Sequence, residues 1–548
     1  MTKVRDLHRQ LEDRVFAVPK VQREFVWNGA RAAALLDSIY RGMPIGSILI
    51  WETGRANCDL LRPSLNVLPL YDTHNKIIRY LIDGQQRLSV LYQALKGDCK
   101  KNSSGQDVDF RRLSFRIDGP KGKDAPDWFS YRKAVQGQYV SVADVLAPNW
   151  KRLLRGLNMT QFRRAHLCRE RLLDYRVPVI IVESADLDEV RETFIRVNTQ
   201  GMKISGADRA FARASKIDLR EKAHDLREHL PNGFRGLEYA AVLLGFTFVD
   251  PEPEREPDVG ARAMENAVAR WERRMKADGA AKKQFLLQWG RYRMAFLKTL
   301  DYLHDNFSVL GLNFLPSVNM LATLAVFFYH HKAAPSSKRR AEICKWFWAT
   351  GVGKRYSGRG HRQNILGDVD FFEKLARTER AVFHFENLAD PSDVQKTEYT
   401  QPAALTKAFL CLLACQEPCY LKSGECFPLE KAAASANRGD RHHVFPKALL
   451  NNYGFRHRDY NSLCNISLVV AEENQSFGSD SPRTYLEDFR HKQFFARAMK
   501  SHLLPYKGDS ALWLEGVGKA FREFRKQRLV LICQAFEREA GIRLFRKE

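Results

Sequence analysis

The residues best suited to chemistry lie in the segment Asp440-Arg-His442-His443-Val-Phe-Pro446. Two asparagines follow it, Asn465 and Asn474, nine positions apart on either side of an apolar run. A neutral imidazole can take a proton from water near pH 7. Nitrogen and oxygen ligands suit a hard divalent cation, Mg²⁺ or Mn²⁺. Together these residue types indicate metal-assisted hydrolysis of a phosphodiester.

These side chains must be positioned by short elements. His443 is predicted at the end of a strand, Asn465 at the start of a second extended stretch, and Asn474 at the opening of a helix. A hairpin followed by a helix can bring two histidines and one asparagine to a single cation. In the plainer alternative the histidines occupy a turn and the asparagines are unrelated, which requires four polar residues to match this apolar pattern by chance.

A second pattern lies between a strand predicted at 77–83 and a helix predicted at 88–95. Its sequence is Asp83-Gly84-Gln85-Gln86-Arg87. A glycine turn between a strand and a helix presents backbone N–H groups to an anion, and Arg87 can add charge-assisted hydrogen bonds. We expect Gln22 and Arg23 to face the same pocket, and Asp83 to orient a metal ion or a water. The alternative is a structural turn in which Asp83 and Arg87 form an internal ion pair.

Other basic residues are candidates for phosphate contacts. Arg359 and Arg362 lie in a glycine-containing basic loop and are candidate DNA-binding residues. A helix predicted at 511–538 carries Arg522, Arg525, Lys526 and Arg528. It either follows a phosphate backbone or forms a solvated face. Cysteines 411, 415, 419 and 426 lack the paired C-x2-C knuckles of a zinc ribbon, so we do not expect them to bind zinc.

Composition narrows the class of protein. The 548 residues carry 88 Lys and Arg against 64 Asp and Glu, a net charge of +24, which favours a polyanionic partner such as nucleic acid. Hydrophobic residues make up 45%, which excludes wholesale disorder. No apolar run is long enough for a membrane helix, and the charged N-terminus is no signal peptide. Ten sparse cysteines fit a reducing cytoplasm.

The chain is predicted to be an α+β protein in three parts. Residues 1–204 alternate short helices and strands, including a helix at 30–40. Residues 205–399 are mostly helical, with an exposed loop at 250–258 and a core helix at 318–329. Residues 400–548 form a separate block that contains the two histidines and the long basic helix. No P-loop motif G-x-x-x-x-G-K-[ST] occurs, so any nucleotide hydrolysis would be of another type.

The C-terminal pattern resembles the HNH (ββα-metal) nucleases. The resemblance implies that His443 is the general base and that His442 and Asn474 hold the metal. It also implies that Asn465 is a structural tie that orients the loop of the base. Asp440 would be an outer carboxylate. His442 stands where many HNH enzymes have Asp.

The N-terminal motifs resemble the ParB/sulfiredoxin-like domain of GmrSD-type, modification-dependent restriction proteins. In order they are Val18-Pro19-Lys20 through Trp27, Gly42-Met-Pro44-Ile-Gly46, Asp83 through Arg87, and Phe194 through Gly201. Arg355-Tyr356-Ser357 resembles the family's helical segment. The SspE-like members join this domain to an HNH domain in one chain. The resemblance implies binding and hydrolysis of a GTP- or ATP-type nucleotide, coupled to sensing of modified DNA.

The sequence thus predicts a cytoplasmic phage-defence endonuclease that acts on double-stranded, modified DNA, under the control of a nucleotide and without a membrane partner. A homo-oligomer or a partner protein of the defence system is left open. Two alternatives remain. One is a ParB-like DNA-binding regulator with an inactive HNH domain. The other is an RNase or toxin that uses the same metal site.

Overall fold

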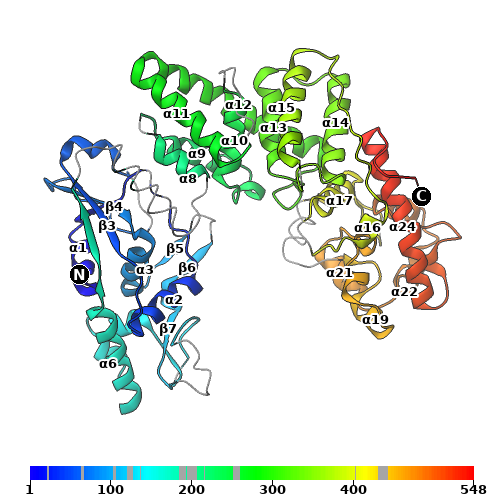
Figure 1. Ribbon diagram of the computed structural model, residues 1–548. Coiled ribbons are helices and arrows are strands. Elements are labelled where there is room, and N and C mark those ends of the chain that lie inside the picture. Colours follow the sequence, from blue (N-terminus) through cyan, green and yellow to red (C-terminus); the bar gives the residue numbers. More distant parts are fainter. Residues whose placement is uncertain are drawn as a thin grey trace. The chain divides into compact units, whose positions relative to one another are not determined.

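The computed structural model describes the chain except for a set of short segments, namely residues 21, 23, 63–66, 103–105, 120–127, 136, 184–189, 191, 192, 194–205, 215, 251–258, 359, 401, 402, 430–441 and 548. The chain divides into two compact units (Figure 1). The first comprises Met1–Lys222 with Val268–Gly279, and the second comprises Ala223–Ala267 with Ala280–Glu548. The mixed α and β content confirms the predicted α+β class, whereas the ParB-like and HNH domains remain predictions.

The first unit is built on a four-stranded sheet in the order β11-β3-β4-β2. Its strands are β2 (Phe16–Ala17), β3 (Ile48–Thr53), β4 (Ile78–Asp83) and β11 (Val179–Val182). The central strands β3 and β4 are antiparallel, and the two outer pairs are parallel. Strands β1 (Thr2–Lys3) and β10 (Arg176–Val177) form a separate antiparallel pair.

Helices supply most of the apolar core of the first unit. They are α1 (Val4–Glu12), α2 (Gly29–Tyr40), α3 (Gln85–Lys96), α4 (Val142–Leu146), α5 (Trp150–Leu153) and α6 (Met159–Asp174). Leu36, Leu88 and Leu172 from three of them belong to one buried cluster. Asn28 is the N-cap of α2, and its side chain accepts a hydrogen bond from the Arg31 amide. The small strands β5 (Cys99–Lys101) and β6 (Asp107–Asp109) form one hairpin, and β7 (Leu113–Arg116), β8 (Phe129–Tyr131) and β9 (Tyr139–Ser141) form a three-stranded sheet.

Long helices dominate the middle of the chain, as the sequence predicts. This part contains α8 (Gly206–Arg213), α9 (Leu219–Glu228) and α11 (Ala261–Ala277). In the second unit it also contains α10 (Tyr239–Phe248), α12 (Ala280–Phe307), α13 (Asn319–His330), α14 (Ser337–Val352) and α15 (His361–Arg377). Helix α13 is the predicted core helix, and its residues Met320 through Tyr329 are all buried. No helix in the described part of the chain has the length and apolar character needed to cross a bilayer.

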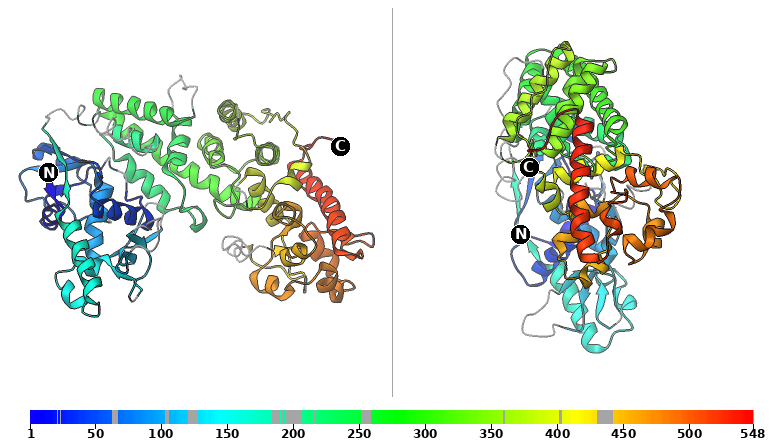
Figure 2. Two further views of the ribbon diagram at one scale, coloured as in Figure 1. Left: turned by 60° about the horizontal axis from the view of Figure 1, so that its bottom comes forward. Right: turned by 90° about the vertical axis from the view of Figure 1, so that its right-hand side faces the viewer.

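The C-terminal part of the second unit holds the predicted nuclease residues. Its elements are α16 (Ser392–Lys396), α17 (Ala404–Cys415), β12 (His442–His443), α19 (Lys447–Asn452), α20 (His457–Tyr460), β13 (Ile466–Ser467), α21 (Ala471–Phe477), α22 (Pro482–Leu486), α23 (Phe495–Ser501) and α24 (Val517–Ala540). Helix α24, red in Figure 2, packs against α14, where the Trp348 and Phe536 rings lie 5.7 Å apart. This packing joins the helical and C-terminal parts into one unit.

Candidate active site

His443 lies on a two-residue strand whose position is set by a neighbouring strand. β12 pairs with β13 in antiparallel register, His442 opposite Ser467 and His443 opposite Ile466. The His443 ring Nε2 lies 2.8 Å from Asn461 Oδ1. An amide oxygen only accepts hydrogen bonds, so Nε2 is the protonated ring nitrogen. The imidazole is therefore held by a side chain that the sequence analysis did not single out.

Asn465 is fully buried and joins the two strands to the preceding loop. Its Oδ1 accepts a hydrogen bond from the Phe445 amide at 2.9 Å. Its Nδ2 donates to the Phe445 and Tyr460 carbonyls at 3.1 and 2.9 Å. Tyr485, also buried, donates to the Val444 carbonyl at 2.8 Å. These contacts immobilise the backbone on the C-terminal side of His443, which is the geometry of a structural tie.

Asn474 lies within α21 and does not open it. The helix begins at Ala471 with Val470 as its N-cap, so the predicted boundary is wrong by three residues. The neighbouring residue Glu473 is directed elsewhere, because its Oε1 accepts a hydrogen bond from the Lys422 amide at 3.0 Å. Burial raises the pKa of Glu473 to about 7.

The metal ligands can be placed only in part. The backbone of His442 belongs to β12, whereas its side chain and the whole of Asp440 lie outside the described residues. Within the described part no three His, Cys, Asp or Glu side chains gather as a metal site. The expected donors are an imidazole and the Asn474 amide, and an amide oxygen is a ligand that Mg²⁺ and Mn²⁺ accept.

The N-terminal motif forms the turn between β4 and α3. Gly84 has a φ of +92° and is the N-cap of α3, which has no side-chain cap. The Arg87 guanidinium donates to the Ile45 carbonyl at 2.6 Å, to the Ser47 carbonyl at 2.8 Å and to Asp83 at 2.7 Å. The ion pair of the structural alternative is thus present. It does not exclude an anion at the first amides of α3, because those amides are separate groups.

The glutamines of this region also make internal hydrogen bonds. Gln22 donates to the Leu81 and Ile82 carbonyls of β4 at 3.0 and 2.8 Å. Gln86 bonds the backbone at positions 24 and 26. Gln85 is buried, and its Oε1 has no hydrogen-bond partner among the described residues. The fold brings Gln22 and residues 83–87 together, while Arg23 and residues 194–201 lie outside the described residues.

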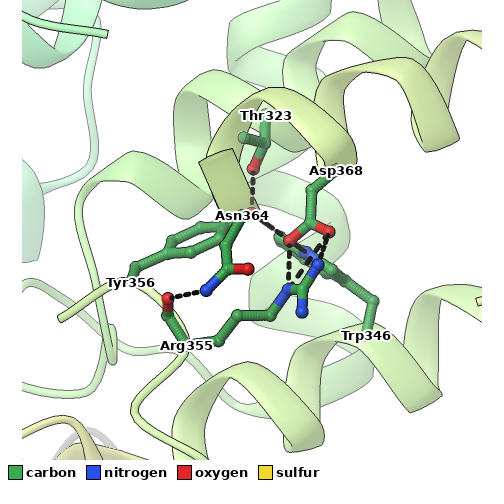
Figure 3. A network of polar contacts seen from close by, with 6 residues as sticks. All are labelled: Thr323, Trp346, Arg355, Tyr356, Asn364 and Asp368. Atoms are coloured by element: carbon green, nitrogen blue, oxygen red, sulfur yellow. Dashed lines mark hydrogen bonds and ion pairs between the residues drawn. The ribbon is translucent and has the colours of Figure 1, made fainter. Parts of the chain in front are cut away.

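A buried polar network fixes the loop before α15 (Figure 3). Asp368 accepts hydrogen bonds from Arg355 Nη2 at 2.7 Å, from Tyr356 Oη at 2.7 Å and from Trp346 Nε1 at 3.0 Å. Asn364 donates to the Arg355 carbonyl at 3.0 Å. Burial, with the Asp368 carboxylate second, raises the pKa of Tyr356 well above its ordinary value. Arg362 is exposed on the first turn of α15, and Arg359 lies outside the described residues.

The basic helix α24 is not a continuous phosphate-binding face. Arg528 is fully buried and donates to the Cys464, His502 and Leu503 carbonyls. Arg525 pairs with Asp459 at 3.3 Å and Lys526 with Glu523 at 3.2 Å. The prediction that Arg528 contacts a phosphate backbone is therefore wrong. The alternation of basic and apolar residues gave no sign that one arginine would face inward.

Comparison with known proteins supports the N-terminal resemblance. Residues 4–214 match the family model described as the GmrSD restriction endonuclease, N-terminal domain. The chain is also 22% identical over 540 residues to the uncharacterized protein MJ0686 of Methanocaldococcus jannaschii, covering 88% of this chain and 86% of that relative. The similarity to that family's N-terminal domain thus covers the first 214 residues and does not extend to the C-terminal residues.

Proposed function

We propose that this protein is a phage-defence DNA endonuclease whose phosphodiesterase site is centred on His443. The observation that supports this proposal most is the held imidazole: its Nε2 is bonded to Asn461, and its strand is tied by the buried Asn465 side chain. The restriction-family match over residues 4–214 supports DNA as the substrate.

The chain's own residues would act as follows. The His443 imidazole takes a proton from a water, and that water attacks the phosphorus in line with the leaving oxygen. Asn465 keeps the loop of the base in place. A divalent cation bound to His442 and Asn474, with Asp440 nearby, would neutralise the charge on the phosphate and on the leaving 3′ oxygen.

The N-terminal unit would bind a GTP- or ATP-type nucleotide and control cleavage. The proposed residues are Gln22, Arg23 and the turn from Asp83 to Arg87. The support is helix α3, whose N-cap Gly84 makes no side-chain cap. Sensing of modified DNA follows from the family resemblance. Arg359 and Arg362 would contact the DNA backbone.

A plasmid nicking assay tests the proposal. Wild type, His443→Ala and the exposed-site control His491→Ala are compared with Mg²⁺ or Mn²⁺ on unmodified and phage-modified DNA, each with and without nucleotide, and on RNA in parallel. We expect wild type and the control to nick DNA, modified DNA preferentially, and His443→Ala to be inactive. Cleavage of RNA alone would favour the RNase alternative. Absence of any cleavage, with DNA binding retained, would favour the regulator.

A further inference from the structure

We propose that Cys419 and Cys426 are a redox-active pair, which hydrogen peroxide oxidises to an intramolecular disulfide and a dithiol reduces again. Both residues are free thiols in the structure. Disulfides that form inside cells are usually transient and sense or transfer oxidising equivalents. The site is a chemical modification site in the second unit, so it stands or fails independently of the proposed nuclease function.

A short hairpin places the two cysteines directly opposite each other. Cys419 and Cys426 form an isolated antiparallel bridge. Inside the hairpin, the Tyr420 amide donates to the Glu425 carbonyl at 2.8 Å, and the Gly424 amide donates to the Tyr420 carbonyl at 2.8 Å. Residues directly opposite in antiparallel strands have Cα atoms about 4.5–5.5 Å apart, within the range of about 4.4–6.8 Å that disulfides span. The main chain therefore already has the separation that a disulfide needs.

The two sulfur atoms are also in contact. Cys419 Sγ lies 3.6 Å from Cys426 Sγ. A disulfide bond is about 2.0 Å long, so its formation requires only a small rotation of the two side chains. The Cys419 backbone is held on both sides, because its amide donates to Ser501 Oγ at 3.1 Å and its carbonyl accepts from His502 Nε2 at 2.7 Å. Oxidation can therefore proceed in the folded protein without displacement of the main chain.

The surroundings of the two sulfurs give them different parts in the reaction. Cys426 is exposed, and Nη2 of Arg497 on α23 lies 3.2 Å from its Sγ. Access to solvent and a cationic neighbour are features of cysteines that react with oxidants. Cys419 is only 1% exposed, and burial raises the pKa of its thiol, with the Cys426 sulfur as the second cause. Cys426 is therefore the sulfur that meets the peroxide, and Cys419 is the sulfur that then displaces the oxygen.

The oxidation takes two steps, each of which releases one water. The Cys426 sulfur attacks one oxygen of hydrogen peroxide, the O–O bond breaks, and the leaving hydroxide takes the thiol proton, which gives a sulfenic acid and water. The Cys419 sulfur then attacks the sulfenic sulfur, the S–O bond breaks, and the oxygen leaves as water with the Cys419 proton. The two thiols lose two electrons to the peroxide. A dithiol later breaks the S–S bond by exchange, and its own thiols become the disulfide.

Metal binding is the other chemistry that two neighbouring cysteines suggest. A structural zinc ion needs four ligands. In the described part of the chain, no three His, Cys, Asp or Glu side chains gather to hold a metal. The Arg497 guanidinium beside Cys426 would also repel a cation. These surroundings suit an oxidisable pair better than a metal site.

Peptide mapping of the full chain tests the pair directly. Trypsin cuts after Lys422, between the two cysteines, and gives the peptides 408–422 and 423–431. After native wild type is treated with hydrogen peroxide, we expect these peptides to be joined with the loss of two hydrogen atoms. Fragmentation should place the link at Cys419, and a dithiol should restore the separate peptides. Peptides that stay separate, or a link from Cys426 to a different cysteine, would overturn the proposal.

Two variants test the order of the steps. In Cys419→Ser the disulfide cannot form, and the sulfenic-acid probe dimedone should label Cys426. In Cys426→Ser the same probe should leave Cys419 unlabelled, whereas Cys99→Ser, at another exposed cysteine, should form the disulfide as wild type does. Labelling of Cys419 in Cys426→Ser would overturn the order. Thermal melting shows whether each variant is folded, and the wild-type map decides the proposal even if Cys419→Ser is not.

The role of Arg497 has its own test. Arg497→Gln removes the cation beside Cys426 and should slow disulfide formation by roughly 2- to 5-fold, the effect expected of an exposed charge pair. The control Lys500→Gln removes a positive charge from an exposed position on the same helix and should react at the wild-type rate. Thiol counts at set times after addition of peroxide measure these rates. Equal rates for Arg497→Gln and wild type would overturn the role given to Arg497.

Discussion

At the scale of single residues, the polar side chains of both predicted sites are largely occupied by internal bonds. Arg87 is the clearest example of a predicted ligand-binding side chain that makes internal hydrogen bonds. It was expected to contact a nucleotide, yet its guanidinium bonds two carbonyls of the loop before β3 as well as Asp83. A Cβ on Gly46 would lie 2.1 Å from Arg87 Nη1, so the glycine permits this close approach. Activity assays on Arg87 variants must therefore be read together with stability.

Replacing Arg87 is expected to destabilise the first unit whether or not it touches nucleotide. Arg87→Ala leaves the Ile45 and Ser47 carbonyls and Asp83 without this donor, at a cost of about 2–4 kcal/mol. The thermal melting temperature of the full chain is the measurement, with the exposed Arg152→Ala as control. If Arg87→Ala melts like wild type but no longer hydrolyses nucleotide, a direct binding role is the better explanation.

Replacing Asn465 is likewise expected to destabilise the second unit. Asn465→Ala removes three hydrogen bonds from a fully buried site and leaves the Phe445 amide without its acceptor. We therefore expect the free energy of unfolding to fall by about 2–4 kcal/mol. Urea denaturation of variant and wild type measures it. Asn465→Asp keeps the acceptor for the Phe445 amide but loses both donors, and it should not restore stability. A variant as stable as wild type would contradict the tie.

At the scale of elements, local sequence patterns identified several helices and strands correctly. The helix expected at 30–40 is α2, and the strand expected at 77–83 is β4. Helix α3 begins at Gln85, three residues before the prediction, because Gly84 in the left-handed conformation turns the chain directly from strand to helix. Apolar periodicity finds the body of an element, whereas its ends depend on caps that the pattern does not contain.

His502, which directly follows α23, should make the free energy of unfolding depend on pH. This ring is completely buried, its Nε2 donates to the Cys419 carbonyl at 2.7 Å, and its Nδ1 accepts from Ser467. Burial lowers the pKa of His502 from 6.5 to about 4, with Arg528 as a smaller cause in the same direction. Only the unfolded chain takes up this proton between these values, so stability falls as the pH falls from 6.5 toward 4.

The expected size is about 2 kcal/mol between pH 7 and pH 5, from about 1.4 kcal/mol for each unit of pKa difference. Urea denaturation at the two pH values measures it. His502→Gln should reduce the dependence, while His491→Gln, at an exposed position, should retain it. Equal pH dependence of wild type and His502→Gln would show that other groups are responsible.

At the scale of the whole molecule, contacts between distant parts of the sequence were beyond prediction. Glu398 and His457 are 59 residues apart, and Arg528 meets the carbonyl of Cys464 across 64. A single sequence marks a chemically distinctive cluster such as the two histidines, but an ordinary Glu, His and Asn carry no sign that they will meet. The candidate base was therefore predictable, whereas the Asn461 side chain that is bonded to its ring was not.

The charge of the whole molecule leads to the last prediction. With a net charge of +24, binding to DNA should release counterions, and affinity should fall steeply with salt. If about six to ten phosphates are contacted, the loss is on the order of 10³- to 10⁵-fold between about 50 and 200 mM salt. Fluorescence anisotropy with a labelled duplex measures this slope.

Arg362→Ala should reduce the slope by about one phosphate contact, because Arg362 is exposed at the start of α15 beside the loop held by Asp368. Arg380→Ala removes the same charge from an exposed position beyond the end of this helix and should leave the slope unchanged. Equal slopes for all three proteins would show that the loop before α15 does not contact DNA.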